Sequence, residues 1–132
     1  VKDTSYRVDQ LQEFVRRYGR DYTVIGAGDS LTYANFAVGA VAHISAASNV
    51  FPEVFVQLYE AVRRGDYRGA RELQFRIDEI KDALERGPYI TPYKEALRLR
   101  GIDVGTVSSP LRPMTGEERE ALRKNLKALG VI

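Results

Sequence analysis

Residues 41–46 constrain the fold of this 132-residue chain more than any other stretch. They are almost wholly apolar apart from His43, and apolar residues at helical spacing precede and follow them. A strand that is apolar along its length and lies between helices is typical of a parallel sheet that is covered on both faces. Residues 22–25, a short β-branched and aromatic run before Gly26, predict a second strand of the same sheet.

Helical patterns separate and follow these strands. Val8, Leu11 and Val15 predict a helix that ends at Gly19, and a shorter helix is expected over residues 31–38. After residue 51 only helices are expected. They begin at Pro52, after Asp66, near Tyr93 and after the capping box of Thr115 and Glu118.

A third strand is inferred to end at Lys2, because turn and cap residues follow directly. Three strand–helix units followed by a helical tail predict part of an α/β architecture. Parallel strands must close into a barrel or continue into a wider sheet, and three strands with open edges do neither. We therefore expect the chain, whose first residue is Val1 and not methionine, to be a piece of a longer protein.

Composition excludes several classes of protein. Apolar residues make up 44% of the chain and charged residues 29%, which argues against a disordered segment. The chain has no apolar run near the length of a membrane span, so no membrane helix is expected. It has no cysteine, so neither a disulfide scaffold nor a thiolate metal site is expected. The absence of cysteine also fits a cytoplasmic location. Twenty basic residues against 18 acidic ones give a net charge of +2, which argues against a nucleic-acid partner.

Lys2 is the first candidate for chemistry. At the carboxyl end of a barrel strand a lysine faces the active site, where its amine can form a Schiff base with a carbonyl substrate. The alternative is a solvated lysine near a chain end, which is the commoner situation.

The turn after residue 25 is the second candidate. Gly26, Ala27 and Gly28 allow a ligand to approach the backbone closely, and Asp29 can accept a hydrogen bond or cap the next helix. A plain tight turn is the alternative. Leu31 stands where a dinucleotide fingerprint needs its third glycine, which argues against a dinucleotide site. His43 is the only histidine, so a structural role is expected for it rather than a metal site.

Taken together and in order, these segments resemble the superfamily of dihydrodipicolinate synthase and N-acetylneuraminate lyase, the pyruvate-dependent class I aldolases. The resemblance runs through the whole chain. The segments that carry it are Val1-Lys2-Asp3-Thr4-Ser5, Gly26-Ala27-Gly28-Asp29, Gly39-Ala40-Val41-Ala42-His43-Ile44-Ser45 with Asn49 and Pro52, Pro92-x-Lys94-x-Ala96-Leu97, and Pro110-x-Arg112-Pro113-Met114.

The resemblance implies the C-terminal part of a TIM (β/α)8 barrel. Residues 1–51 would hold strands six to eight with their intervening helices, and residues 52–132 the eighth barrel helix and a C-terminal helical extension. Lys2 would form a covalent imine with pyruvate, without any cofactor or metal. Backbone carbonyls near Ala27 and Ile44 would line the pocket, and Asp29 would contact the distal part of the acceptor.

The function that the resemblance implies is a pyruvate-dependent lyase, with dihydrodipicolinate synthase (pyruvate plus aspartate semialdehyde) first. A 2-keto-3-deoxy sugar-acid aldolase and a catalytically incomplete barrel fragment are the alternatives. Ser30 stands where sialic-acid lyases carry a glutamate, and Ala27 where the family usually has glycine. In the family, the tyrosine of a Y-N-x-P motif relays protons and a G-T-[TS]-G-E motif holds the pyruvate carboxylate. Neither motif is in the chain. The expected partners are therefore the N-terminal half of the barrel and the small-molecule substrates. Because a tetramer is the usual oligomeric state in the family, three further copies of the protein are also expected.

Overall fold

The computed structural model describes all residues, 1–132, and the chain forms two compact units, residues 1–78 and 79–132. The boundary falls within one helix, α4 (Tyr67–Leu84). The division into barrel strands over residues 1–51 and a tail over residues 52–132 remains a prediction about the whole barrel, of which this chain would be the C-terminal part. Each helix is too short or too polar to span a bilayer.

The first unit is built on parallel strands, as expected. β1 (Ile25–Ala27) pairs with β2 (Ala42–Ile44), and Lys2 forms an isolated parallel bridge with Ile25 on the other side of β1. β1 lies further along the chain than residues 22–25. Gly26 and Ala27, expected in a turn, belong to the strand because β2 pairs with them along their length.

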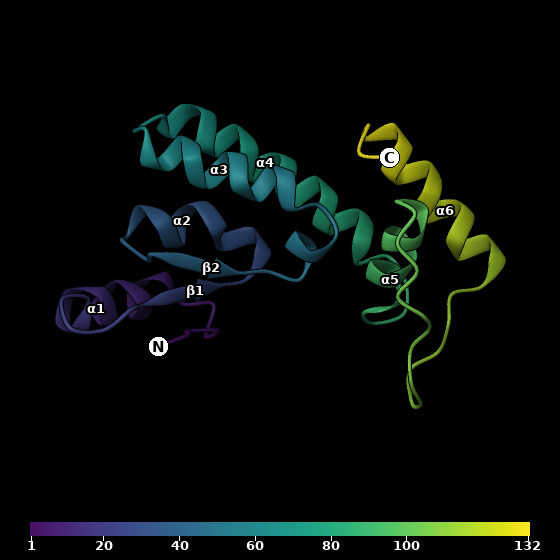
Figure 1. Cartoon of the computed structure of the whole chain (residues 1–132), viewed down its shortest axis with the longest axis horizontal. Helices are drawn as coiled ribbons and strands as arrows, with labels where there is room; N and C mark the ends of the chain where they lie inside the picture. Colours follow the sequence, from purple (N-terminus) through teal and green to yellow (C-terminus); the bar gives the residue numbers. More distant parts are fainter. The chain divides into compact units, whose positions relative to one another are not determined.

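Helices cover this small sheet in the order that the sequence pattern predicts. α1 (Val8–Tyr18) comes first, and the 3-10 turn η1 (Asp29–Leu31) leads into α2 (Thr32–Ala37). A second 3-10 turn, η2 (Ala47–Asn49), precedes α3 (Pro52–Arg63). α2 packs against both strands, and α3 packs on α2 (Figure 1).

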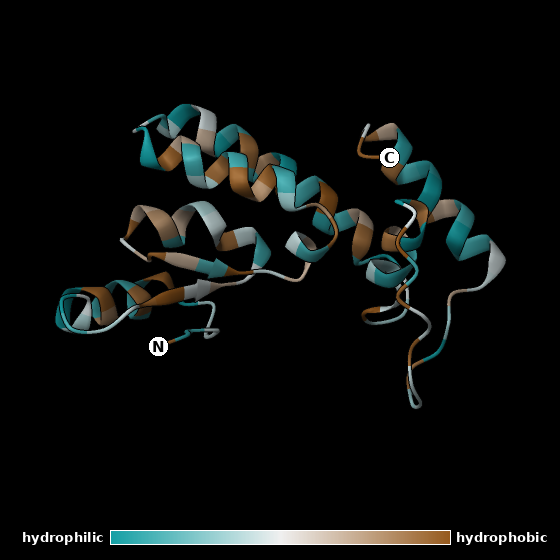
Figure 2. Ribbon diagram, in the orientation of Figure 1, coloured by the Kyte–Doolittle hydropathy of each residue, from teal (hydrophilic) through white to brown (hydrophobic).

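The helix starts confirm the capping patterns. Pro52 occupies the first turn of α3, and the carboxylate of Asp66 accepts a hydrogen bond from the backbone N–H of Gly69 at 2.8 Å, at the start of α4. Hydrophobic and hydrophilic residues alternate along α3 and α4, as expected for helices that each bury one stripe (Figure 2).

The second unit contains the end of α4 together with α5 (Thr91–Leu99) and α6 (Gly116–Ala128), and α5 packs against α6. α6 begins at the expected capping box: the Thr115 hydroxyl accepts from Glu118 N at 3.2 Å, and the Glu118 carboxylate accepts from Thr115 N at 2.8 Å. The Arg112 guanidinium donates two hydrogen bonds to the same carboxylate, of 2.7 and 2.8 Å. The Arg112 guanidinium and the Thr115 N–H lower the pKa of Glu118 to about 2.

Candidate active site

The register of the strands places three of the predicted site residues on one face of the sheet. Paired residues in parallel strands point to the same face, and faces alternate along a strand. Lys2 pairs with Ile25, two residues before Ala27, and Ala27 pairs with Ile44. Lys2, Ala27 and Ile44 therefore share one face, whereas His43 points to the opposite face, toward α2.

Lys2 is held by its backbone while its side chain is exposed. Ile25 N donates to Val1 O at 2.8 Å, and Asp3 N donates to Ile25 O at 2.9 Å, so both neighbours of Lys2 are fixed to β1. The amine thus projects from a rigid strand position at the carboxyl edge. This is the placement that a carbonyl-reacting lysine needs, because a nucleophile must be accessible and well oriented.

Ala27 and Ile44 differ in their surroundings. Ala27 is buried, and its carbonyl oxygen accepts a hydrogen bond of 3.1 Å from Asn35 Nδ2, which leaves the second lone pair of that oxygen for another donor. The Ile44 side chain is 47% exposed on the face that carries Lys2. The structure describes these contacts of the protein alone, and the roles of the two carbonyls toward substrate remain predictions.

Asp29 is buried and joins the loops that follow the two strands. One carboxylate oxygen accepts from Ala47 N at 3.3 Å, in the loop after β2, and the side chain caps neither η1 nor α2. Its backbone carbonyl accepts from Thr32 Oγ1 at 2.9 Å and from Gln74 Nε2 at 3.0 Å. Asp29 therefore holds the carboxyl edge together, in addition to any role toward the acceptor.

His43 belongs to a polar network that the sequence pattern did not reveal. The hydroxyl of Thr32 donates its only proton to Asp29 O, so it accepts from His43 Nε2 at 3.2 Å. Asn35 Nδ2 donates to His43 Nδ1 at 3.3 Å. These partners select the neutral Nε2–H tautomer, because a protonated Nδ1 would face another donor. The expected structural role of His43 agrees with this network.

We expect the free energy of unfolding to decrease as the pH falls below about 6.5 because of His43. Burial lowers the pKa of His43 below its ordinary value of 6.5, although the nearby Asp29 carboxylate opposes that shift. The unfolded chain therefore binds a proton at a pH where the folded chain does not. The stabilisation is complete above 6.5 and is lost as the pH drops toward the folded pKa. Urea unfolding between about pH 5.5 and 8, above the range where most carboxylates titrate, measures the slope.

His43→Gln is the matched variant for this measurement. Its slope over the same pH range should be flatter than that of the unsubstituted protein. Identical slopes for the two proteins would show that another group is responsible.

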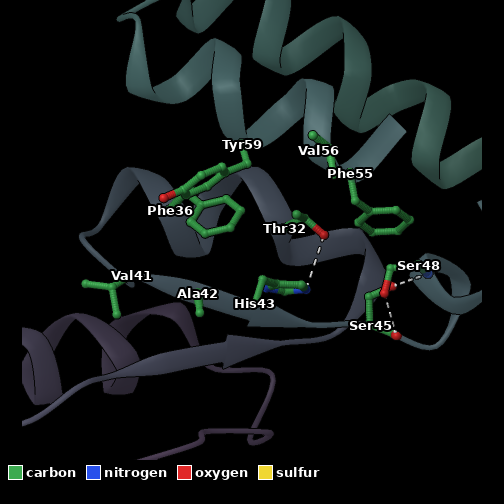
Figure 3. A pocket seen from close by; sticks show the side chains of 10 residues that line it. All are labelled: Thr32, Phe36, Val41, Ala42, His43, Ser45, Ser48, Phe55, Val56 and Tyr59. Carbon is green, nitrogen blue, oxygen red and sulfur yellow. Dashed lines mark hydrogen bonds between the residues drawn. The ribbon is translucent and has the colours of Figure 1, made fainter. Parts of the chain in front are cut away.

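A cavity of about 260 Å³ lies along β2 on the side of His43 and the helices (Figure 3). Phe36 and Tyr59 line it with their ring centroids 5.3 Å apart, and Phe36 lies 6.0 Å from His43. In Figure 3 His43 lies on the side of β2 that faces α2, and a dashed line joins it to Thr32. Because Lys2 is on the other face of the sheet, this cavity is separate from the candidate site. No group of three His, Asp or Glu side chains is placed to hold a metal ion.

Comparison with known proteins matches this chain to one family. The model of the dihydrodipicolinate synthetase family matches residues 1–129. A DapA-like lyase of Halobacterium salinarum is 41% identical over 132 residues, which are all of this chain and 43% of that protein. The chain thus spans less than half the length of the curated relatives that it matches.

Two solved structures show the same fold. Dihydrodipicolinate synthase from Bacillus anthracis is 33% identical with a TM-score of 0.88, over 96% of this chain and 44% of that one. KD(P)GA from T. tenax is 30% identical with a TM-score of 0.88, over 98% of this chain and 46% of that one. The architecture is therefore that of the C-terminal part of a TIM barrel, as the sequence predicted.

Proposed function

Because the chain belongs to the dihydrodipicolinate synthetase family, we propose that it supplies the imine-forming lysine and the last three strands of a pyruvate-dependent class I lyase. The observation that carries this proposal is the placement of Lys2. It stands at the carboxyl end of a parallel strand, on the face that it shares with Ala27 and Ile44 and away from α2. In a barrel this face lines the active site.

The chemistry follows from an amine at that position. The neutral Nζ of Lys2 adds to the keto carbon of pyruvate, the keto oxygen leaves as water, and a protonated imine forms. The positive nitrogen draws electrons from the neighbouring methyl group, which loses a proton to a base and becomes a nucleophilic enamine. The enamine carbon bonds to the aldehyde carbon of the acceptor, whose oxygen takes a proton. Water then hydrolyses the imine and frees Lys2.

The base and the carboxylate-binding groups would come from the upstream half of the barrel, since the corresponding motifs are absent here. β2 has no strand partner on its second edge, and a parallel strand of that half would pair there. We refer to the two halves together as the complete barrel. The complete barrel would act in the cytoplasm and without a cofactor. It would form a tetramer, the usual oligomeric state in the family.

For the acceptor we propose aspartate semialdehyde first, as in a dihydrodipicolinate synthase. The similarity to the Bacillus anthracis enzyme and to the 4-hydroxy-tetrahydrodipicolinate synthase of Methanopyrus kandleri, 38% identical over 136 residues, supports it. A 2-keto-3-deoxy sugar-acid aldolase is the second candidate. The structural similarity to KD(P)GA supports it, with the same TM-score as the similarity to the Bacillus anthracis enzyme.

Borohydride trapping tests the imine. When the complete barrel is incubated with pyruvate and reduced, we expect a mass increase of one reduced pyruvyl group, located by peptide mapping on Lys2. The reason is that reduction converts a reversible imine into a stable amine. An adduct on another lysine, or no adduct at all, would overturn the proposed function.

The control is the 132-residue chain by itself. It lacks the proton-relay and carboxylate-binding motifs, so its aldol turnover should be near background even if Lys2 is intact. Turnover at the rate of the complete barrel would contradict the assignment of those groups to the upstream half.

A further inference from the structure

Tyr6 has a backbone conformation that tyrosine rarely adopts. Its φ is +60°, in the left-handed region that favours glycine, and Ile90 is the only other non-glycine residue with a positive φ. A tyrosine in this region is strained, and strained residues concentrate at functional sites.

Two hydrogen bonds, one donated by the residue before Tyr6 and one by the residue after it, hold this conformation. The carboxylate of Asp3 accepts from Ser5 N at 2.8 Å, and the hydroxyl of Ser5 accepts from Arg7 N at 3.2 Å. Gln10 Nε2 donates to the same oxygen of Asp3 at 3.3 Å and ties the turn to α1. The segment after Lys2 is thus a braced turn, which directs the side chain of Tyr6.

The Tyr6 ring rests on Gly28, at the carboxyl end of β1. A Cβ built on Gly28 would lie 2.7 Å from Tyr6 Cε1 and 3.2 Å from Cδ1 and Cζ, so the ring lies directly against this glycine. Gly28 follows Ala27, which is on the Lys2 face of the sheet. Tyr6 itself follows Lys2 by four residues. The ring therefore stands at the edge from which the predicted nucleophile projects.

A packing role explains this arrangement poorly. Tyr6 is 69% exposed among these 132 residues, so its ring buries little apolar surface against this chain. Glycine or asparagine would adopt the same φ with less strain. A ring that a strained turn places against Gly28, at the carboxyl edge of the sheet, is suited to contact with a ligand.

We propose that Tyr6 bounds the acceptor end of the active site and selects short aldehydes over long ones. The ring occupies space beside Gly28 that the distal carbons of a longer acceptor would need. Asp29, the next residue, lies at the same edge and is the predicted contact for the distal part of the acceptor. This assignment rests on the proposed function, because it assumes that an imine forms on Lys2.

Tyr6→Gly in the complete barrel tests the proposal. Glycine relieves the strained φ, so the thermal midpoint should not fall, and borohydride trapping of pyruvate on Lys2 should be retained. We expect the ratio of kcat/KM for a five-carbon acceptor (glutamate semialdehyde) to that for the four-carbon aspartate semialdehyde to rise by about tenfold. Ring closure and hydration of these aldehydes affect both proteins equally and cancel.

Two variants complete the experiment. Tyr6→Phe keeps the ring and should keep the preference for the short aldehyde. Tyr22→Gly removes a tyrosine of similar exposure, 62%, before the amino end of β1, and should leave the ratio unchanged. An unchanged ratio in Tyr6→Gly with trapping retained would overturn the role of Tyr6 alone. Failure of the unsubstituted barrel to trap pyruvate would overturn the proposed function, and this proposal with it.

Discussion

Replacing Lys2 with arginine is expected to lower kcat of the complete barrel by at least about 10⁴-fold and to abolish the reduced pyruvyl adduct. Arginine keeps the positive charge and much of the length of lysine. Its guanidinium remains protonated at any pH at which the protein is folded, so it cannot attack a keto carbon. The loss would therefore reflect the missing nucleophile and not a missing charge.

The same substitution should leave the fold intact. The Lys2 side chain is exposed, and its neighbours Val1 and Asp3 are tied to β1 through backbone atoms that Lys2→Arg does not touch. The free energy of unfolding should change by less than about 0.5 kcal/mol, as for most exposed substitutions. Steady-state turnover, trapping and urea unfolding measure these three quantities on one preparation.

Lys124→Arg on α6 is the matched control, since it makes the same chemical change at an exposed position on another element. It should retain both turnover and the adduct. If Lys2→Arg kept turnover close to that of this control, Lys2 would not be the nucleophile.

Replacing Gly26 with alanine is expected to lower the free energy of unfolding by about 3 kcal/mol. A Cβ at Gly26 would lie 2.5 Å from Asn35 Nδ2 and 2.7 Å from Asn35 Cβ and Cγ. Asn35 is 3% exposed, so its side chain has no free space to move into. The new methyl group would displace the amide from Ala27 O and His43 Nδ1 and leave buried polar atoms without partners.

Urea unfolding with an unchanged m-value would measure this loss. Gly116→Ala is the control, because no atom lies within 4 Å of the position where its Cβ would be and Gly116 is the first residue of α6. Alanine there should leave stability unchanged or raise it by up to about 1 kcal/mol, since it is the better helix former. Equal effects of the two substitutions would show that the contact with Asn35 is unimportant.

The surroundings of Gly26 show that small residues near a site can be interpreted in two ways. The sequence pattern predicted a turn at which a ligand approaches the backbone. In the structure Gly26 is a strand residue, and it is α2 that approaches closely, through Asn35. Both interpretations need a residue without a Cβ, and only the position of Asn35 distinguishes them. A polar residue at helical spacing looks the same in a sequence whether it faces solvent or a strand.

Local sequence patterns were sufficient to predict the helix starts, the parallel strands and the candidate nucleophile. Helix starts at Pro52, Asp66 and Thr115 depend on bonds and contacts within a few residues, so the pattern predicts them. The apolar strand at residues 41–46 predicted a parallel sheet, and the turn residues after Lys2 predicted the end of a strand.

Which side chains contact one another could be read only from the folded chain. The shared face of Lys2, Ala27 and Ile44 depends on strand register, and a slip of one residue would turn Ile44 to the opposite face. The contact of Tyr6 with Gly28 likewise joins residues far apart in the chain. Such contacts are set by the packing of whole strands and helices. No local preference of the residues involved encodes them, so they become visible only when the chain is folded.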